Sequence, residues 1–194
     1  FWKYDNDDNG AVSYWHHIGE TAPAGEDWST FQAWMGDEQD VIEDIDAEGS
    51  GWAFRTFFVH RPNGWYFMGW SANPDGPMPT LGQVHFDGDG VPFALSGVTY
   101  TTVWTAEAGG RTWTITPSSV PETLSFNGNQ IDGAWDIEMV TDTGDAAFEG
   151  TWTLVGARGI VRFDLVGLRV DGGSGAPWEL VRDAAWSDVL GANR

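Results

Sequence analysis

The stretch WAFRTFFVHRPNGWYFMGW, residues 52–70, decides the fold class of this chain. Aromatic and β-branched residues dominate positions 52–60 and 65–70, and both residue types are enriched in β-strands. The intervening Arg61-Pro62-Asn63-Gly64 is rich in turn-forming residues, so the two runs are expected to form an antiparallel hairpin. With a period of two, one face of the first strand carries Trp52, Phe54, Phe58 and His60, and the opposite face carries Arg55 and Phe57.

The same pattern of short runs separated by turns continues to about residue 182. The turns predict further hairpins, the first of which joins residues 83–86 to residues 91–95. A last strand is expected over Trp178–Arg182, which brings the total to roughly nine or ten strands. The turn sequences are Asp87-Gly88-Asp89-Gly90, Ala108-Gly109-Gly110, Asn127-Gly128 and Gly156-Ala157-Arg158-Gly159.

The chain is expected to form a single domain, with residues 51–182 as its antiparallel body. Residues 1–50 form an acidic N-terminal segment, and residues 183–194 are expected to form a C-terminal helical turn. Within the first segment, Trp28, Phe31 and Met35 recur at helical spacing and Gly36 follows them, which predicts a short helix over residues 26–35.

Two all-β architectures satisfy this pattern. One is a jelly-roll-type sandwich of two sheets, and the other is a closed, lipocalin-like barrel. In a barrel, one aromatic face of residues 52–60 would line an internal cavity.

The composition excludes several classes of partner. Nine Lys and Arg residues against 29 Asp and Glu residues give a formal charge of −20, which repels nucleic acids and anionic membrane surfaces. No apolar run approaches the ~20 residues that cross a bilayer, so we expect no membrane insertion. The absence of cysteine excludes disulfides, thiolate nucleophiles and cysteine-based zinc sites. The acidic bias also suits a high-salt (halophilic) habitat, and thirteen Trp residues provide rings that can stack on a sugar or another flat ligand.

The N-terminal sequence Asp5-Asn6-Asp7-Asp8-Asn9-Gly10-Ala11 fits the start of a calcium-binding loop. The ligands of Ca²⁺ would be the side chains of Asp5, Asp7 and Asn9 and the backbone carbonyl of Ala11. His16 stands where an EF-hand has a bidentate Glu, which excludes an EF-hand but leaves a looser extracellular calcium loop. The alternative is a solvated turn.

Two carboxylate clusters are candidates for acid/base chemistry. Asp136 and Glu138 lie about 7 Å apart on one face of a predicted strand, between the separations of retaining and inverting glycoside hydrolases. The run Asp44-Ile45-Asp46-Ala47-Glu48 resembles the E-x-D-x-E strand motif of laminarinase-type glycoside hydrolases. That resemblance implies Asp44 in place of the nucleophile and Glu48 as the acid, provided that the run is extended. An acidic, solvated edge accounts for both clusters more simply.

The ligand-binding candidates are Trp65, Trp70, Arg55 and His60. Together these features predict an extracellular or cell-surface domain that binds or processes glycans, stabilised by calcium. One alternative is a lipocalin-like barrel that binds or transforms an apolar small molecule. Another is a self-assembling subunit of a surface layer, filament or virion, and whether the protein is an enzyme stays open.

Overall fold

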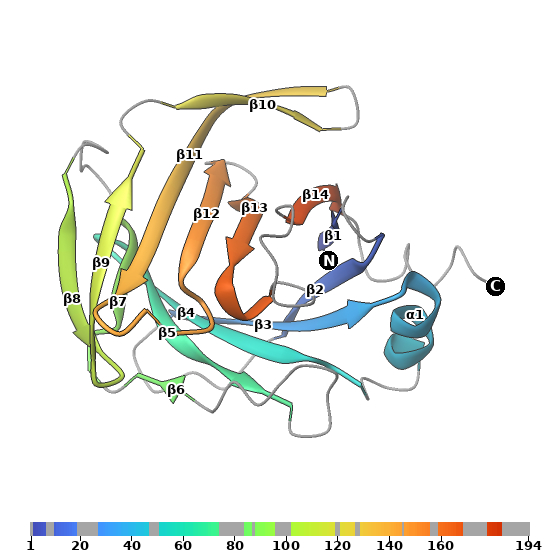
Figure 1. Cartoon of the computed structure of the whole chain (residues 1–194), viewed down its shortest axis with the longest axis horizontal. Helices are drawn as coiled ribbons and strands as arrows, with labels where there is room; N and C mark the ends of the chain where they lie inside the picture. The colour runs from blue at the N-terminus through green and yellow to red at the C-terminus, as the bar shows by residue number, and fades with distance from the viewer. Residues whose placement is uncertain are drawn as a thin grey trace.

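The computed structural model of the chain consists mostly of antiparallel β-strands, with one short α-helix near the N-terminus (Figure 1). The structure describes residues 2–6, 10–18, 27–46, 51–73, 84–86, 88–95, 102–118, 121–126, 129–144, 146–155, 159–168 and 178–183. The elements in these ranges are β1 (Trp2–Asn6), β2 (Val12–Ile18), β3 (Asp27–Gly36), α1 (Glu38–Asp46), β4 (Phe54–Arg61), β5 (Gly64–Ala72), β6 (Val84–His85), β7 (Val91–Leu95), β8 (Trp104–Ala108), β9 (Arg111–Pro117), β10 (Glu122–Phe126), β11 (Asn129–Thr141), β12 (Gly150–Val155), β13 (Gly159–Leu165), the 3-10 helix η1 (Val166–Leu168) and β14 (Trp178–Asp183).

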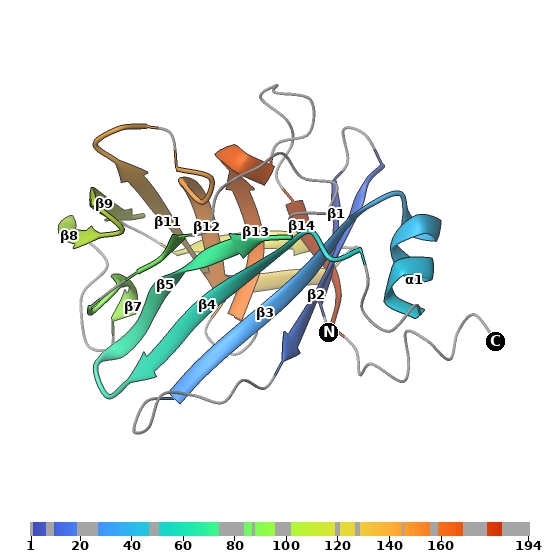
Figure 2. The same ribbon diagram turned by 90° about the horizontal axis from the view of Figure 1, so that it is seen from below.

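The strands form two antiparallel six-strand sheets that meet where β1 pairs with β14 (Figures 1 and 2). The continuous order is β6-β5-β4-β3-β2-β1-β14-β13-β12-β11-β9-β8, while β7 pairs with β5 and β10 pairs with β11. One of the two sheets curls into a half-barrel, so the inner faces of both sheets surround a shared interior. The all-β expectation is confirmed.

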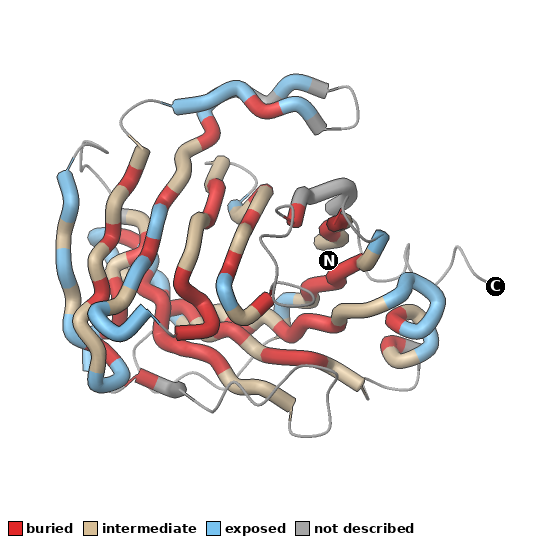
Figure 3. Tube along the Cα trace, in the orientation of Figure 1, coloured by how far each residue is buried: buried red, intermediate tan, exposed pale blue. Residues whose placement is uncertain are grey.

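A large aromatic cluster, rich in tryptophan, fills one part of this interior. Buried positions follow the strands of both sheets (Figure 3). The rings of Trp70 and Phe148 lie 5.1 Å apart between centroids, and those of Phe86 and Trp113 lie 5.7 Å apart. Each buried aromatic side chain removes about 150–250 Å² from water, so this cluster supplies much of the driving force for folding.

The expected helix over residues 26–35 is wrong, because Asp27–Gly36 forms the central strand β3. Phe31 and Ala33 pack into the large aromatic cluster on the inner face. Trp28 and Trp34 pack into two separate apolar clusters on the outer face. A strand that is buried on both faces loses the alternation of polar and apolar residues, and its aromatic residues then coincide with helical spacing.

The helix begins instead at Glu38 and covers part of the outer face of the N-terminal sheet. Val41 and Ile45 of α1 pack against Tyr14 and Trp34. The helical conformation contradicts the extended run proposed for residues 44–48, because residues two apart on a helix differ by about 200° in direction. Residues 44–46 are therefore helical and not extended, and Glu48 lies outside the described residues. No helix in the described part of the chain is long and apolar enough to cross a bilayer.

Most of the predicted hairpins are confirmed, and one is wrong. The pairs β4–β5, β8–β9, β10–β11 and β12–β13 form as expected, and β14 is the expected last strand. However, β6 and β7 both pair with β5 and not with each other. The described residues contain fourteen strands where nine or ten were expected, partly because residues 1–50 contribute three of them. Of the predicted C-terminal helical turn over residues 183–194, only Asp183 is described, and it ends β14.

The face assignment in β4 is confirmed for Phe54 and Phe58, which both join the inner cluster. Trp52 lies just before the strand and is on the other side, where the Arg55 guanidinium lies 4.6 Å from the centre of its ring. The assignment of Trp52 to the inner face is therefore wrong, because the period of two does not extend beyond the end of the strand.

A buried carboxylate organises the connection between β11 and β12. Glu149 is only 3% exposed, and its side chain accepts hydrogen bonds from the Ala146 amide at 2.8 Å and the Thr141 hydroxyl at 2.7 Å. The backbone amide of Thr141 also donates to this carboxylate. These contacts satisfy buried backbone donors that no strand ladder reaches.

Replacing Glu149 with Ala is expected to lower the free energy of unfolding by about 2–4 kcal/mol, because it leaves buried amide groups without an acceptor. Denaturant unfolding monitored by tryptophan fluorescence measures this change. Glu107→Ala removes an exposed carboxylate that accepts one hydrogen bond from Thr112, and it is the matched control. Equal losses in the two variants would contradict the structural role of Glu149.

Candidate functional site

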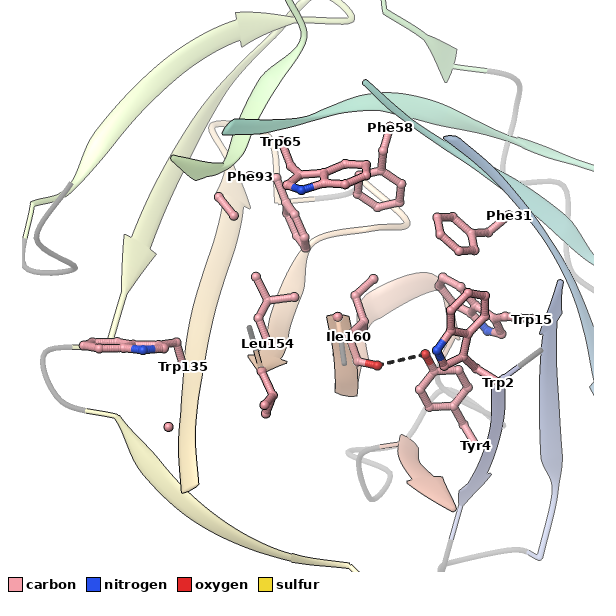
Figure 4. Close-up of a pocket in the computed structure, with 14 residues that line it drawn as sticks. Trp2, Tyr4, Trp15, Phe31, Phe58, Trp65, Phe93, Trp135, Leu154 and Ile160 are labelled. Atoms are coloured by element: carbon pink, nitrogen blue, oxygen red, sulfur yellow. Dashed lines mark hydrogen bonds between the residues drawn. The ribbon is translucent and has the colours of Figure 1, made fainter. Parts of the chain in front are cut away.

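A cavity of about 420 Å³ lies between the inner faces of the two sheets, beside the aromatic cluster (Figure 4). Its volume is within the range of about 300–1,000 Å³ that is typical of small-molecule sites. None of the fourteen lining residues is charged. Eight of them carry aromatic rings: Trp2, Tyr4, Trp15, Phe31, Phe58, Trp65, Phe93 and Trp135. The other six are Ala94, Gly133, Leu154, Val155, Gly159 and Ile160.

Strand alternation and register bring these rings together from distant parts of the sequence. Trp2 pairs with Trp15 across β1 and β2, so both side chains project from the same face. The ring of Trp2 lies 5.3 Å from that of Phe31 on β3, in an edge-to-face arrangement. On the opposite sheet, Trp135 pairs with Leu154 across β11 and β12.

Trp152 separates the cavity from the filled part of the interior. Its ring lies 5.3 Å from Phe93 and 6.4 Å from Phe58, which both line the cavity. It also stacks on Phe148 of the aromatic cluster, with 6.1 Å between the ring centroids. Because Trp152 is fully buried and has rings on both sides, it supports Phe58 and Phe93 from behind, away from the cavity.

Two glycines help to keep the cavity open on the side of the C-terminal sheet. Gly133 and Gly159 both line it, and both have a φ angle of +79°, which side-chain-bearing residues rarely adopt. A Cβ atom at either position would meet nothing within 4 Å. The positive φ angle therefore favours glycine at two positions where a side chain would otherwise project into open space.

Tyr4 supplies the only hydroxyl group among the lining residues. Its hydroxyl donates to the carbonyl oxygen of Ile160 at 3.0 Å, which links β1 to β13 (Figure 4). Burial raises the pKa of the Tyr4 phenol well above its ordinary value, because the charged form would lose its hydration. The lining therefore stays uncharged across the physiological pH range.

The predicted ligand-binding residues Trp65 and His60 come together at the edge of the cavity. They face each other across β4 and β5, with 4.9 Å between their ring centroids. Trp65 lines the cavity and is 39% exposed, so its indole is accessible to a ligand. His60 Nδ1 lies 3.5 Å from a carboxylate oxygen of Asp27, a pair that is ionic only when the imidazole is protonated.

The other two predicted ligand-binding residues are not at the cavity. Trp70 is only 2% exposed and belongs to the aromatic cluster, so its proposed role at the surface is corrected to packing in the core. Arg55 lies on the outer face, where its Nε donates to Gln32 at 2.8 Å and its guanidinium covers Trp52. The alternation within a strand separates it from Phe54 and Phe58.

The predicted acid pair on β11 also faces away from the cavity. Trp135 lines the cavity, so its neighbour Asp136 projects from the opposite face of the strand. Arg162 Nη2 lies 3.2 Å from Asp136 and 3.6 Å from Glu122, while Glu138 is exposed. This arrangement is that of an ion-pair network on the sheet surface, and catalysis by Asp136 and Glu138 stays a prediction.

The predicted calcium site lies only partly within the described residues. Asp5 is on β1 and its carboxylate lies 3.3 Å from Lys3 Nζ, while the carbonyl of Ala11 accepts the amide of Asn6 at 3.0 Å. Asp7 and Asn9 are outside the described residues. In the part of the chain that the structure describes, no group of three or more His, Cys, Asp or Glu side chains could hold a metal ion. Calcium binding stays a prediction.

Sequence reasoning did not identify most of the cavity. The missed lining residues include Tyr4, Trp15, Phe93 and Trp135, which come from four different strands. Each lies in an apolar stretch that a core residue would also occupy. The sequence does show aromatic residues on the inner faces of the strands, but this pattern is the same for a filled interior and for one that contains a cavity.

Comparisons with known proteins found no matching family model, no matching curated protein and no matching solved structure. The geometry and chemistry of the cavity therefore carry the functional conclusion.

A polar contact holds β1, which supplies Trp2 and Tyr4 to the cavity, against α1. Lys3 Nζ lies 2.9 Å from Glu38 Oε1, and the Tyr14 hydroxyl donates to the same oxygen at 3.0 Å. The hydrogen bond from Lys3 is the main cause that lowers the pKa of the Glu38 carboxyl group below its ordinary value.

Replacing Glu38 with Gln is expected to reduce the loss of stability in acid. A carboxyl group with a lowered folded-state pKa stabilises the protein fully above its unfolded-state pKa, and this stabilisation is lost as the pH falls through the folded-state pKa. Urea unfolding between about pH 6 and pH 3 measures the effect. Glu43→Gln removes the same charge from an exposed position on the same helix and is the control. Parallel stability curves for wild type and Glu38→Gln would show that the contact with Lys3 does not stabilise the fold.

Proposed function

We propose that the protein binds an apolar small molecule in the cavity between its two sheets. The observation that carries this proposal is the uncharged, mainly aromatic lining of a cavity of about 420 Å³. An apolar ligand that enters such a site loses contact with water, which contributes about 25 cal/mol per Å² of buried apolar surface. Trp65, partly exposed at the edge, would cover the bound molecule.

The lining supports an apolar ligand better than a glycan. A sugar ring can stack on an indole, but its hydroxyl groups need hydrogen-bonding partners once they leave water. The Tyr4 hydroxyl, the only one in the lining, already donates to Ile160. Glycan binding is supported only by the accessible indole of Trp65, and it remains the competing outcome of the experiment below.

Binding is better supported than turnover. Tyr4 is the only titratable side chain among the lining residues, and burial opposes its ionisation. A general acid or base with a pKa near neutrality is therefore not among the groups that face the ligand. A carrier or storage function fits this lining.

Of the two expected architectures, we favour the lipocalin-like barrel over the jelly-roll sandwich. A single ladder of strands runs from β6 around to β8 and encloses the cavity. No ladder in the described ranges joins β8 to β6 or β7. However, the indole of Trp104 on β8 donates to the carbonyl of Pro92 on β7 at 3.1 Å, which brings the two ends of the sheet together.

Titration with Nile red, a neutral apolar dye, tests the proposal. We expect dye fluorescence to rise with a stoichiometry of about one per chain. Leu154→Trp should fill the cavity and weaken binding at least ~tenfold, a loss of about 1.4 kcal/mol. Val140→Trp adds the same side chain to the exposed face of the neighbouring strand β11, where Val140 is 39% exposed, and should leave binding unchanged.

The competing functions give different results in the same experiment. Quenching of tryptophan fluorescence by soluble oligosaccharides, without dye binding, would favour the glycan function. Absence of both signals, with salt- or calcium-dependent assembly in light scattering, would favour a structural subunit. Equal dye affinity in the two variants would place the dye outside this cavity.

A further inference from the structure

We infer that the ligand of this cavity is a neutral, conjugated or aromatic molecule, and that the cavity rejects an anionic form of the same molecule. This inference rests on the proposed function and specifies its ligand class. It follows from the charge and ring content of the lining and from the charges around it.

The first argument concerns charge. A carboxylate that leaves water for this lining would meet no cationic side chain among the described residues that line it, since none of them is charged. The faces of aromatic rings carry negative partial charge, so they also disfavour an anion. The chain's formal charge of −20 adds a repulsive field at every distance that salt does not screen.

The groups at the edge of the cavity do not reverse this preference. The imidazole of His60 lies beside Trp65, with 4.9 Å between the ring centroids, and the carboxylate of Asp27 lies 3.5 Å from its Nδ1. His17 lies near the ring of Phe31, with 5.3 Å between centroids. The carboxylate of Asp27 would repel an anion that approaches along this edge.

The second argument concerns the rings. Eight of the fourteen lining residues are aromatic, and they come from both sheets. The Trp2 and Phe31 rings pack edge to face, an arrangement that a flat ligand in the cavity could adopt with the same rings. A conjugated or aromatic ligand can continue such ring contacts, whereas a saturated chain gains only from the burial of its surface.

Retinol and retinoate form a matched pair of probes, because they share one conjugated chain and differ in an alcohol against a carboxylate. Energy transfer from the cavity tryptophans to the bound polyene reports binding at about pH 8. We expect retinol to bind at least ~tenfold more tightly than retinoate, and hexadecanol, a saturated alcohol, to compete at least ~tenfold more weakly than retinol. Equal or tighter binding of retinoate would overturn the charge selectivity, and equal competition by hexadecanol would overturn the preference for conjugated ligands.

A cation placed in the lining should weaken the preference for the neutral ligand over the anionic one. Leu154→Lys is expected to reduce the preference for retinol over retinoate at least ~tenfold, because the ammonium group compensates the carboxylate. Val140→Lys makes the same change in net charge on the exposed face of β11 and should leave the preference unchanged. Val155→Lys, at another lining position, serves where Leu154→Lys does not fold.

The result for Nile red separates this inference from the function on which it rests. If Nile red binds in the cavity but retinol binds no more tightly than retinoate or hexadecanol, the binding function stands and the proposed selectivity is wrong. If Nile red fails to bind as well, the binding function and the ligand class both fall.

Discussion

The packing of aromatic rings around Trp152 is the interaction on which the rest of the structure depends. Trp152 lies on β12, and its ring contacts Trp15 and Phe58 of the N-terminal sheet, at 6.5 and 6.4 Å between centroids. It also contacts Phe148, from its own side of the molecule. Two curved sheets need such a shared set of side chains, because a sheet buries its apolar face only against another layer. The indole of Trp152 therefore sets the distance between the two sheets at the boundary between the aromatic cluster and the cavity.

The cavity lies beyond the dense ring packing around Trp152. There the C-terminal sheet contributes one ring, Trp135, three aliphatic side chains and two glycines, Gly133 and Gly159, to the lining. Protein interiors are otherwise packed as densely as organic crystals, and an empty apolar cavity costs stability. A ligand in this volume of about 420 Å³ would offset that cost, because a ligand bound only to the folded state adds its binding free energy to the stability.

The local pattern was sufficient to predict the hairpins, because turn residues such as Asn63-Gly64 and Gly109-Gly110 act over a few positions. It failed where the outcome depends on the partner layer. Residues 26–35 were predicted to form a helix because β3, which is buried on both faces, lacks the alternation of polar and apolar residues that marks a half-exposed strand. Strands β6 and β7 were predicted to pair with each other, but both pair with β5. For the site, both Trp65 and Trp70 were predicted to bind a ligand; Trp65 lines the cavity, whereas Trp70, in an equally aromatic stretch of sequence, is buried in the core. Only the tertiary arrangement separates these two indoles.

The contrast between an acidic exterior and an uncharged interior links composition to the proposed function. Surface carboxylates keep a chain with thirteen tryptophans dispersed in water, because like charges oppose association. The same charges would repel an anionic ligand, so a cavity that worked for anions would need cations in its wall. Four described arginines make contacts elsewhere: Arg162 pairs with Asp136, Arg111 donates to Thr143, and Arg55 and Arg61 cover the rings of Trp52 and Tyr66. None of these four cations lines the cavity, which is why the proposed ligand is one that apolar and ring contacts can hold without a counter-charge.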